Sequence, residues 1–161
     1  MKGRMVMTIP DEISALLRGF PTVGACEQAF PFLSVDADGF PHSALLSRSE
    51  LEPAVGGETL LAAVASSRTR ANLLRSGTAA LLAVDGTVCH HLKLGLVASV
   101  IFEDVLGCEF ALAEHKRDDI GIAMRPLTFR TSADLVEEEN WARSAMVFAR
   151  LEAGRAARKG E

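Results

Sequence analysis

The sequence predicts a mainly β protein whose strands close into a small barrel with flanking helices. The first observation is the period-two alternation of residues 87–104, which is typical of a strand whose two faces differ. The second is a pair of turns, Asp38-Gly39 and Asp85-Gly86, each set between apolar runs. The third is that a single helix, over residues 66–77, interrupts the strands. Long bent strands and short hairpins with only one internal helix are typical of small barrels.

The composition is that of one globular domain spanning residues 1–161. Hydrophobic residues make up 48% and charged residues 24%, and the net charge of −4 disfavours a general nucleic-acid binder. No apolar run approaches the roughly 20 residues that span a bilayer, and the N-terminus lacks the pattern of a secretory signal. Cys26, Cys89 and Cys108 are odd in number and widely spaced, which favours buried reduced thiols and a cytoplasmic location.

The first elements along the chain are an arm, a short helix and a hairpin. Residues 1–9 are expected to form a frayed arm. Pro10 and the acidic residues after it start a short helix, which Gly19 ends. The apolar runs at residues 29–35 and 40–47 predict two strands joined by the first Asp-Gly turn.

The middle of the chain supplies the remaining strands. Residues 59–65 predict a third strand, and the continuous apolar run at 78–84 predicts a strand buried on both faces. The long alternating stretch would reach roughly 60 Å if straight, so it must bend, and Gly95 near its middle is a natural corner. Residues 108–116 and 124–130 are expected to form the last strands.

A helix over about residues 133–158 is expected to end the chain, after possible caps at Thr131 and Ser132. Its acidic start and basic end match the helix dipole, and the simplest interpretation of these charges is a solvated face. The basic residues toward its end are Arg150, Arg155 and Arg158. The predicted apolar stripe comprises Trp141, Ala142, Ala145, Phe148 and Ala149.

Residues 60–75 join a buried strand to a helix through a polar turn. The turn carries, in succession, Ser66, Ser67, Arg68, Thr69 and Arg70. The first amides of a helix lack internal partners and attract negative charge, and arginine offers a planar fork of donors for phosphate oxygens. The pattern therefore indicates a site for an anion. The simpler alternative is a serine that only caps the helix and arginines that only face water.

The order of these elements resembles the pyridoxamine 5′-phosphate oxidase-like flavin-binding split barrels. The resemblance covers about residues 10–130 and is sharpest at the motifs of residues 32–47 and 66–77. It implies a six-stranded antiparallel split β-barrel over about residues 25–131, with an N-terminal, an internal and a C-terminal helix. It also implies that the chain binds FMN and forms a homodimer, with the cofactor in a groove between the subunits.

The resemblance further implies which positions meet the cofactor. The turn that matches Ser67, Arg68 and Thr69 holds the FMN phosphate, with Arg70 in reserve. The strand of residues 42–47 runs along the isoalloxazine ring and offers it backbone amides and carbonyls, and the long strand brings a polar side chain, His90 in this sequence, to the ring edge. The expected cofactor-binding residues are His42, Ser43, Ala44, Leu45, Ser47, Ser66, Ser67, Arg68, Thr69 and His90. No catalytic residue is assigned.

The sequence departs from the oxidase itself at several positions. His42 stands where the oxidase has arginine, while Ser47 and Thr69 stand where it has lysine, and the chain contains no tyrosine. Each missing charge-assisted bond removes about 1.5–3 kcal/mol of phosphate binding. We therefore expect an FMN-dependent oxidoreductase that acts on an unidentified small-molecule substrate or electron donor rather than on vitamin B6. The alternatives are a non-catalytic barrel that binds flavin or another cofactor, and a structural dimerisation domain.

Cys89, His90 and His91 are adjacent, but a strand points neighbouring side chains to opposite faces, so only Cys89 and His91 share a side. A transition-metal site would need further ligands of compatible geometry. The sequence therefore predicts no metal site. His115 precedes a run of charged residues and is expected to be exposed, like the strand end that follows it.

Overall fold

The computed structural model of the protein describes residues 7–160. The helices are α1 (Asp11–Leu17), α2 (Ser67–Ser76), α3 (Ala133–Glu138) and α4 (Trp141–Lys159). The strands are β1 (Cys26–Gln28), β2 (Phe30–Val35), β3 (Pro41–Leu46), β4 (Leu51–Pro53), β5 (Thr59–Val64), β6 (Thr78–Asp85), β7 (Val88–Phe102), β8 (Val105–Asp119) and β9 (Thr128–Arg130). No helix in this part of the chain is long and apolar enough to cross a membrane.

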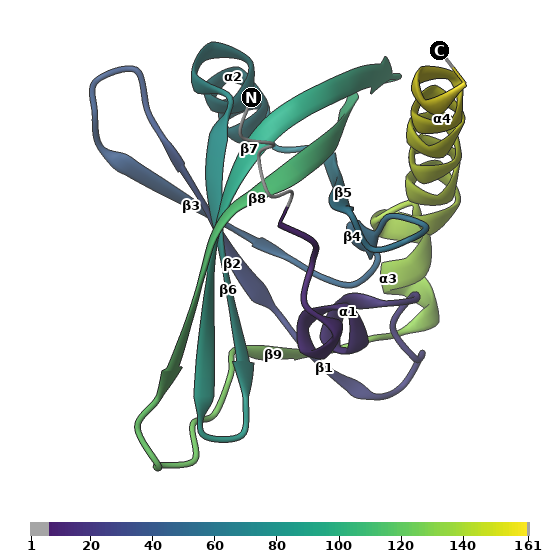
Figure 1. Cartoon of the computed structure of the whole chain (residues 1–161). Coiled ribbons are helices and arrows are strands. Elements are labelled where there is room, and N and C mark those ends of the chain that lie inside the picture. The colour runs from purple at the N-terminus through teal and green to yellow at the C-terminus, as the bar shows by residue number, and fades with distance from the viewer. Residues whose placement is uncertain (1–6, 161) are drawn as a thin grey trace, which may run out of the picture.

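Seven strands form one curled antiparallel sheet in the order β3-β2-β6-β7-β8-β5-β4, and β1 pairs with β9 in a separate two-stranded sheet (Figure 1). The mainly β split barrel is confirmed, with seven strands in the main sheet where six were expected. The two additional short strands of the described chain, β1 and β4, contain three residues each. Strands this short carry too little periodicity for the sequence to reveal them.

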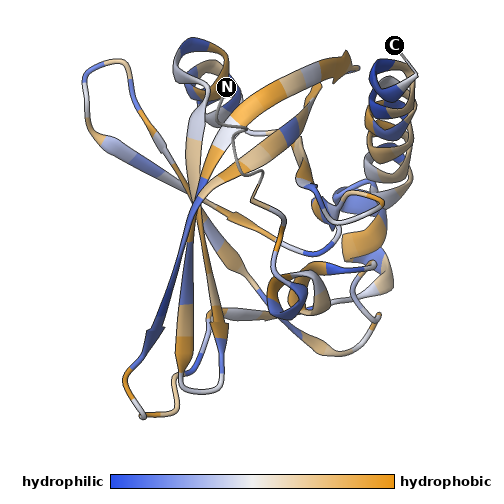
Figure 2. Ribbon diagram, viewed as in Figure 1, coloured by the Kyte–Doolittle hydropathy of each residue, from blue (hydrophilic) through white to orange (hydrophobic). Residues whose placement is uncertain are grey.

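The long hairpin of β7 and β8 forms the middle of the sheet. Each strand has 15 residues, and the pairing shifts register between Lys93 and Leu94 and again between Leu96 and Ala98. These irregularities flank Gly95, so the predicted corner coincides with the break in the ladder. Figure 2 shows hydrophilic residues gathered at the C-terminal end of β8, where the hairpin runs beyond the main core.

The main core fills the concave side of the sheet. Phe32 of β2 and Phe110 of β8 meet there, with their ring centroids 5.9 Å apart, and Leu81 and Leu92 are fully buried beside them. Helix α1 closes this side with Ile13 and its neighbours (Figure 1). Of the expected arm at residues 1–9, residues 1–6 lie outside the described part of the chain.

A second core lies on the other face of β5 and β8, beneath α4. Leu61 of β5 and Val105 of β8 pack there against Val147, Phe148 and Leu151 of the helix. Because β5 is covered on both faces, all its residues after Thr59 are buried, as its apolar run predicts. The similar run in β6 is not buried on both faces as predicted, since most of its residues alternate between buried and partly exposed positions.

The C-terminal helix differs from its prediction in two respects. Asn140, with φ of 52°, breaks it into α3 and α4. The buried stripe of α4 is Ser144, Val147, Phe148, Leu151 and Arg155. The expected stripe positions Ala142, Ala145 and Ala149 are exposed.

The charges of α4 are not all solvated, contrary to the sequence interpretation. Arg155 is buried and donates to Glu109 at 2.7 Å, and Arg158 contacts the same carboxylate. Helix α4 also lies close against β8, because a Cβ placed on Gly107 would come within 2.6 Å of Val147. A buried ion pair therefore holds α4 against the sheet, and the absence of a side chain at Gly107 allows the helix to approach closely.

Glu50, in the turn between β3 and β4, makes the stability of the fold depend on pH. Burial is the largest influence and raises its pKa from 4.5 to about 7, the charge of Glu139 adds to this, and a hydrogen bond from the Ser47 N–H opposes it. Because the folded-state pKa is raised, stability from the neutral carboxyl is present at low pH and is lost as pH rises through 7. The shift corresponds to roughly 3 kcal/mol.

We therefore expect the Glu50→Gln protein to lose less stability than the wild type between pH 5 and pH 8, by roughly 2–3 kcal/mol. The measurement is the free energy of unfolding in urea for both proteins across this range. Other titrating groups are common to both proteins, so the difference isolates Glu50. Parallel pH profiles would show that this carboxyl ionises freely in the folded state.

Candidate functional site

The junction between β5 and α2 is built as its sequence predicts. Ser66 is the N-cap, and its Oγ accepts a hydrogen bond from the N–H of Thr69 at 3.5 Å. Gly77 ends the helix in the left-handed region with φ of 69°, and its N–H donates to the carbonyl of Leu73. The apolar strand, the cap and the terminal glycine together fix where α2 begins.

The hydroxyl and guanidinium groups of this junction differ in their exposure to solvent. Thr69 is fully buried, and its Oγ1 lies 3.3 Å from the Oγ of Ser66. Ser67 and Arg68 are exposed, and Ser67 opens the helix. By position, the first N–H groups of α2 have no acceptor within the helix, so Ser67 and Arg68 present both backbone and side-chain donors to solvent.

Arg68 has one acidic neighbour. Its guanidinium lies 3.7 Å from Asp36 in the β2–β3 turn, while its side chain stays 67% exposed. Asp36 also accepts a hydrogen bond from Asn72 at 2.9 Å. A hollow of about 340 Å³ lies here, lined by Asp36, Asp38, Arg68 and Arg75 among others. An exposed ion pair contributes only about 0–1 kcal/mol, so the contact with Asp36 leaves Arg68 able to bind another anion.

Arg70 adds a second cation to the junction. It is half-buried, and its Nε is buried without a hydrogen-bond partner among the described residues. A buried donor without an acceptor is rare in folded proteins and costs about 1–3 kcal/mol. An anion held at the junction is one group that would satisfy it.

Strand β3 is an edge of the main sheet and pairs only with β2. One row of its backbone N–H and C=O groups therefore has no partner strand in the described part of the chain. Cross-strand partners share a face, so His42, opposite buried Ser34, points toward the core side, and Ala44 follows the same phase. Ser43 and Leu45 point outward, and Leu45 is 57% exposed.

Helix α2 packs on β2 and β3, so the structure brings these β3 positions close to the junction. Asn72 donates to Ser34 at 3.1 Å, and Arg75 contacts the carbonyl of Val35. The predicted phosphate group thus lies beside the β2–β3 turn, at the end of β3 where His42 and Ser43 stand. Leu45 lines a hollow with Ser47 and Glu50 near the other end of the strand. Their roles toward a cofactor stay predictions.

Ser47 lies apart from this group, just after β3. It is 3% exposed, and its Oγ is 2.5 Å from that of Ser49 and 3.5 Å from Oε1 of Glu50. Its neighbours are hydroxyls and a carboxyl group, which provide no positive charge for an anion. Its expected contact with FMN also remains untested.

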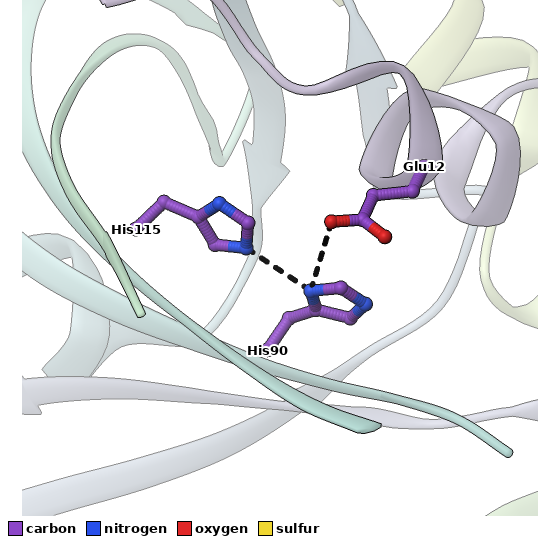
Figure 3. Close-up of side chains that lie close together, drawn as sticks. All are labelled: Glu12, His90 and His115. Carbon is purple, nitrogen blue, oxygen red and sulfur yellow. Dashed lines mark hydrogen bonds and ion pairs between the residues drawn. The ribbon is translucent and has the colours of Figure 1, made fainter. Parts of the chain in front are cut away.

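His90 is the other predicted residue that lies away from the junction. It is opposite Ala83 on the core side of the sheet and has no exposed surface. Its companions are Glu12 of α1 and His115 of β8 (Figure 3). Burial is the main cause that lowers the pKa of His90, and Glu12 opposes it, while His115 and Arg117 add to it.

His115 is partly buried against His90, which corrects its expected exposure. The sequence contained one usable signal for this cluster. His90 falls in the same alternation phase as the buried residues Val88, Leu92 and Leu94, which marks it as inward-facing. No comparable pattern points to Glu12, because its approach depends on how α1 docks on the sheet.

Comparisons with known proteins give matches by structure alone. An F420 reductase superposes with a TM-score of 0.51 at 12% identity, over 67% of this chain and 98% of that chain. The styrene monooxygenase flavin reductase of Pseudomonas putida gives 0.50 at 8% identity, over 66% and 88%. HupZ from Group A Streptococcus gives 0.52 at 14% identity, over 68% and 99%. No protein-family model and no curated protein matches the sequence.

At identities between 8% and 14%, these likenesses concern the fold rather than the activity. They support the architecture that the sequence motifs implied, in which a curled antiparallel sheet carries one internal helix after its β5 strand. The chain therefore has a split-barrel fold shared with a flavin reductase and an F420 reductase.

Proposed function

We propose that the chain binds FMN at the β5–α2 junction and acts as a flavin-dependent oxidoreductase on a substrate still to be identified. The observation that carries the proposal is the pairing of two features in one region. Ser67 and Arg68 are exposed at the start of α2, and α2 packs on β3, whose outer backbone edge is unpaired within the described chain. A flavin nucleotide has a charged phosphate and a planar ring, which suit these two features.

The phosphate would be held by the first amides of α2 and by Ser67 and Arg68. A charge-assisted hydrogen bond contributes about 1.5–3 kcal/mol, more than the roughly 0–1 kcal/mol of the exposed Arg68–Asp36 pair. The phosphate would therefore compete with Asp36 for Arg68, with the first amides of α2 adding donors that Asp36 does not use. Arg70 also lies in the first turn of α2, and its buried Nε, unpaired within the described chain, would become a further donor if the side chain turned toward the phosphate.

The ring would lie along β3, where backbone groups at Ser43, Ala44 and Leu45 supply donors and acceptors. Backbone groups are well suited to this task because they are held in place by the ladder to β2. His42, on the same strand, is a candidate to tune the ring or to meet the substrate. FMN, when bound, supplies two-electron redox chemistry, and the protein's part is to bind, orient and shield it.

A second copy of the chain is the proposed lid of this site. The outer face of β2, β3 and β6 is apolar, and Val35 and Phe40 are 43% and 68% exposed. A hollow of about 250 Å³ on this face is lined mainly by apolar residues, among them Leu33, Pro41 and Ala80. Exposed apolar patches of this kind mark interaction surfaces, and a ligand site normally buries most of its ligand.

Arg68→Ala should weaken FMN binding roughly 10- to 150-fold, because it removes one charge-assisted contact to the phosphate. Riboflavin, which has no phosphate, should lose less than about threefold. Isothermal titration with both ligands measures the two losses. Arg150→Ala, which removes an exposed arginine from α4, is the matched control and should leave both affinities unchanged.

Equal losses for FMN and riboflavin in the Arg68→Ala protein would contradict the assigned phosphate contact. Failure of the wild type to bind either flavin would remove the proposed cofactor altogether. If FMN binds, anaerobic bleaching by a nicotinamide donor separates an oxidoreductase from a carrier, which would stay yellow.

The proposed lid predicts that the chain has twice its 17.2 kDa mass in solution. Val35→Glu should shift the protein toward the monomer and weaken FMN binding, because a charge would be buried in the apolar interface. Sedimentation velocity measures the mass. Ile122→Glu, at a more exposed apolar residue (65%) in the β8–β9 connection, is the control and should stay dimeric. A monomeric wild type that binds FMN tightly would count against the lid.

A further inference from the structure

Three side chains from distant parts of the sequence converge under the N-terminal helix. Glu12 comes from α1, His90 from β7 and His115 from β8, and one ligand atom of each lies within 4.8 Å of the others. Figure 3 shows the carboxylate and one nitrogen of each ring turned toward a common point. We propose that these residues form a binding site for a divalent transition-metal ion such as Zn²⁺.

The spacing of the ligand atoms fits such an ion. Nδ1 of His90 lies 3.0 Å from Nε2 of His115 and 3.9 Å from Oε1 of Glu12. In a tetrahedral zinc site, bonds of about 2.0–2.2 Å place neighbouring ligand atoms roughly 3.3 Å apart. The first separation has to open by about 0.3 Å, which requires a small movement of a histidine ring, and the second has to close by about 0.6 Å. Side-chain rotation of Glu12, which is 38% exposed, can supply the second movement. The remaining pair, Glu12 and His115, has ligand atoms within 4.8 Å of each other.

The chemistry of the set is that of a known class of site. Two imidazoles and one carboxylate are the ligands of His₂Glu zinc centres, which leave a fourth position for water or a substrate. Imidazole and carboxylate also suit other first-row divalent ions, so the site is assigned to this class rather than to one metal. Neutral imidazoles and one carboxylate give the ligand set a single negative charge, which a dication attracts.

The burial of His90 argues that the ring is placed for more than packing. The ring is 0% exposed, and its second nitrogen, Nε2, is buried without a partner among the described residues. An unsatisfied buried nitrogen costs about 1–3 kcal/mol, which an apolar residue would avoid. The alternative to a metal site is a hydrogen bond between the two stacked histidine rings, whose centroids are 5.2 Å apart. That bond accounts for Nδ1 of His90 when no ion is bound, and Nε2 lacks a partner in the described chain with or without an ion at Nδ1. The convergence of three ligand atoms, and not Nε2, therefore supports the site.

One cation competes for the carboxylate. Arg117 contacts Glu12 at 3.4 Å and also lies 4.0 Å from Asp119. Its side chain is 50% exposed, so it can pair with Asp119 when Glu12 turns to the metal. The proposed site does not use the β5–α2 junction, and it gives His90 a role other than the expected contact with the flavin ring edge.

The test is a Zn²⁺ titration of the full chain after treatment with a chelator, read by competition with a chromogenic chelator. The wild type should bind one equivalent, and Glu12→Gln and His115→Gln should each weaken binding at least tenfold. His91→Gln is the matched control. His91 is on the same strand but partly exposed and paired with Asp118 at 3.0 Å, so this variant should bind like the wild type. Zn²⁺ should also raise the melting temperature of the wild type and of His91→Gln, but hardly that of His115→Gln.

Two results would overturn the site. One is a wild type that takes up no Zn²⁺ at about 100 μM, where even a weak specific site would be filled. The other is binding that survives both Glu12→Gln and His115→Gln but is lost in His91→Gln, which would place the ion on the outer face. Both ligand variants change partly exposed side chains, so folding of the chain does not decide the outcome.

Discussion

The register of the β7–β8 hairpin is the constraint on which the rest of the structure depends. Its alternation puts Leu92 and Leu94 into the main core and leaves Lys93 exposed. A slip of one residue would exchange these faces, so burial of the apolar phase fixes the pairing. The same phase turns His90 inward beneath α1. Because β6 and β5 pair with β7 and β8, the hairpin also decides which faces they present to the two cores.

Much of this architecture could be read from the residues. The two Asp-Gly turns, the alternation of residues 87–104 and the serine cap before α2 are local signals, and each element formed where its signal stood. The errors in predicted burial came from interactions between distant segments. The run at 78–84 is as apolar as β5, yet only β5 has α4 packed on its second face. Likewise, Arg155 is buried because Glu109 of β8 lies opposite it, and α4 itself contains no sign of this partner.

In the candidate sites, too, residues adjacent in sequence could be predicted to lie together, and residues brought together by folding could not. Ser66 to Thr69 lie consecutively at one helix terminus, so the sequence alone placed them together, and β3 lies near them because α2 packs on its hairpin. Glu12, His90 and His115 are brought together only by the docking of α1 onto two strands. In the sequence, His90 stands between Cys89 and His91. In a strand, however, immediate neighbours face apart, and the true neighbours come from adjacent elements.

The two proposed sites lie in different parts of one scaffold. Arg68 and the start of α2 are exposed near the free edge of β3, where a phosphate and a ring can be held by donors that folding has already fixed in place. His90 is buried beneath α1, while Glu12 and His115 beside it are partly exposed. The fold thus separates an exposed strand edge suited to a nucleotide from a partly buried set of ligands suited to a small cation.

The central claim is that the β5–α2 junction holds the phosphate of a flavin nucleotide. The most direct measurement is a crystal structure of the protein grown with FMN. The account predicts the phosphate beside Ser67 and Arg68, at the first amides of α2, with the ring along β3. A flavin bound elsewhere on the molecule, with Arg68 still facing Asp36, would contradict it.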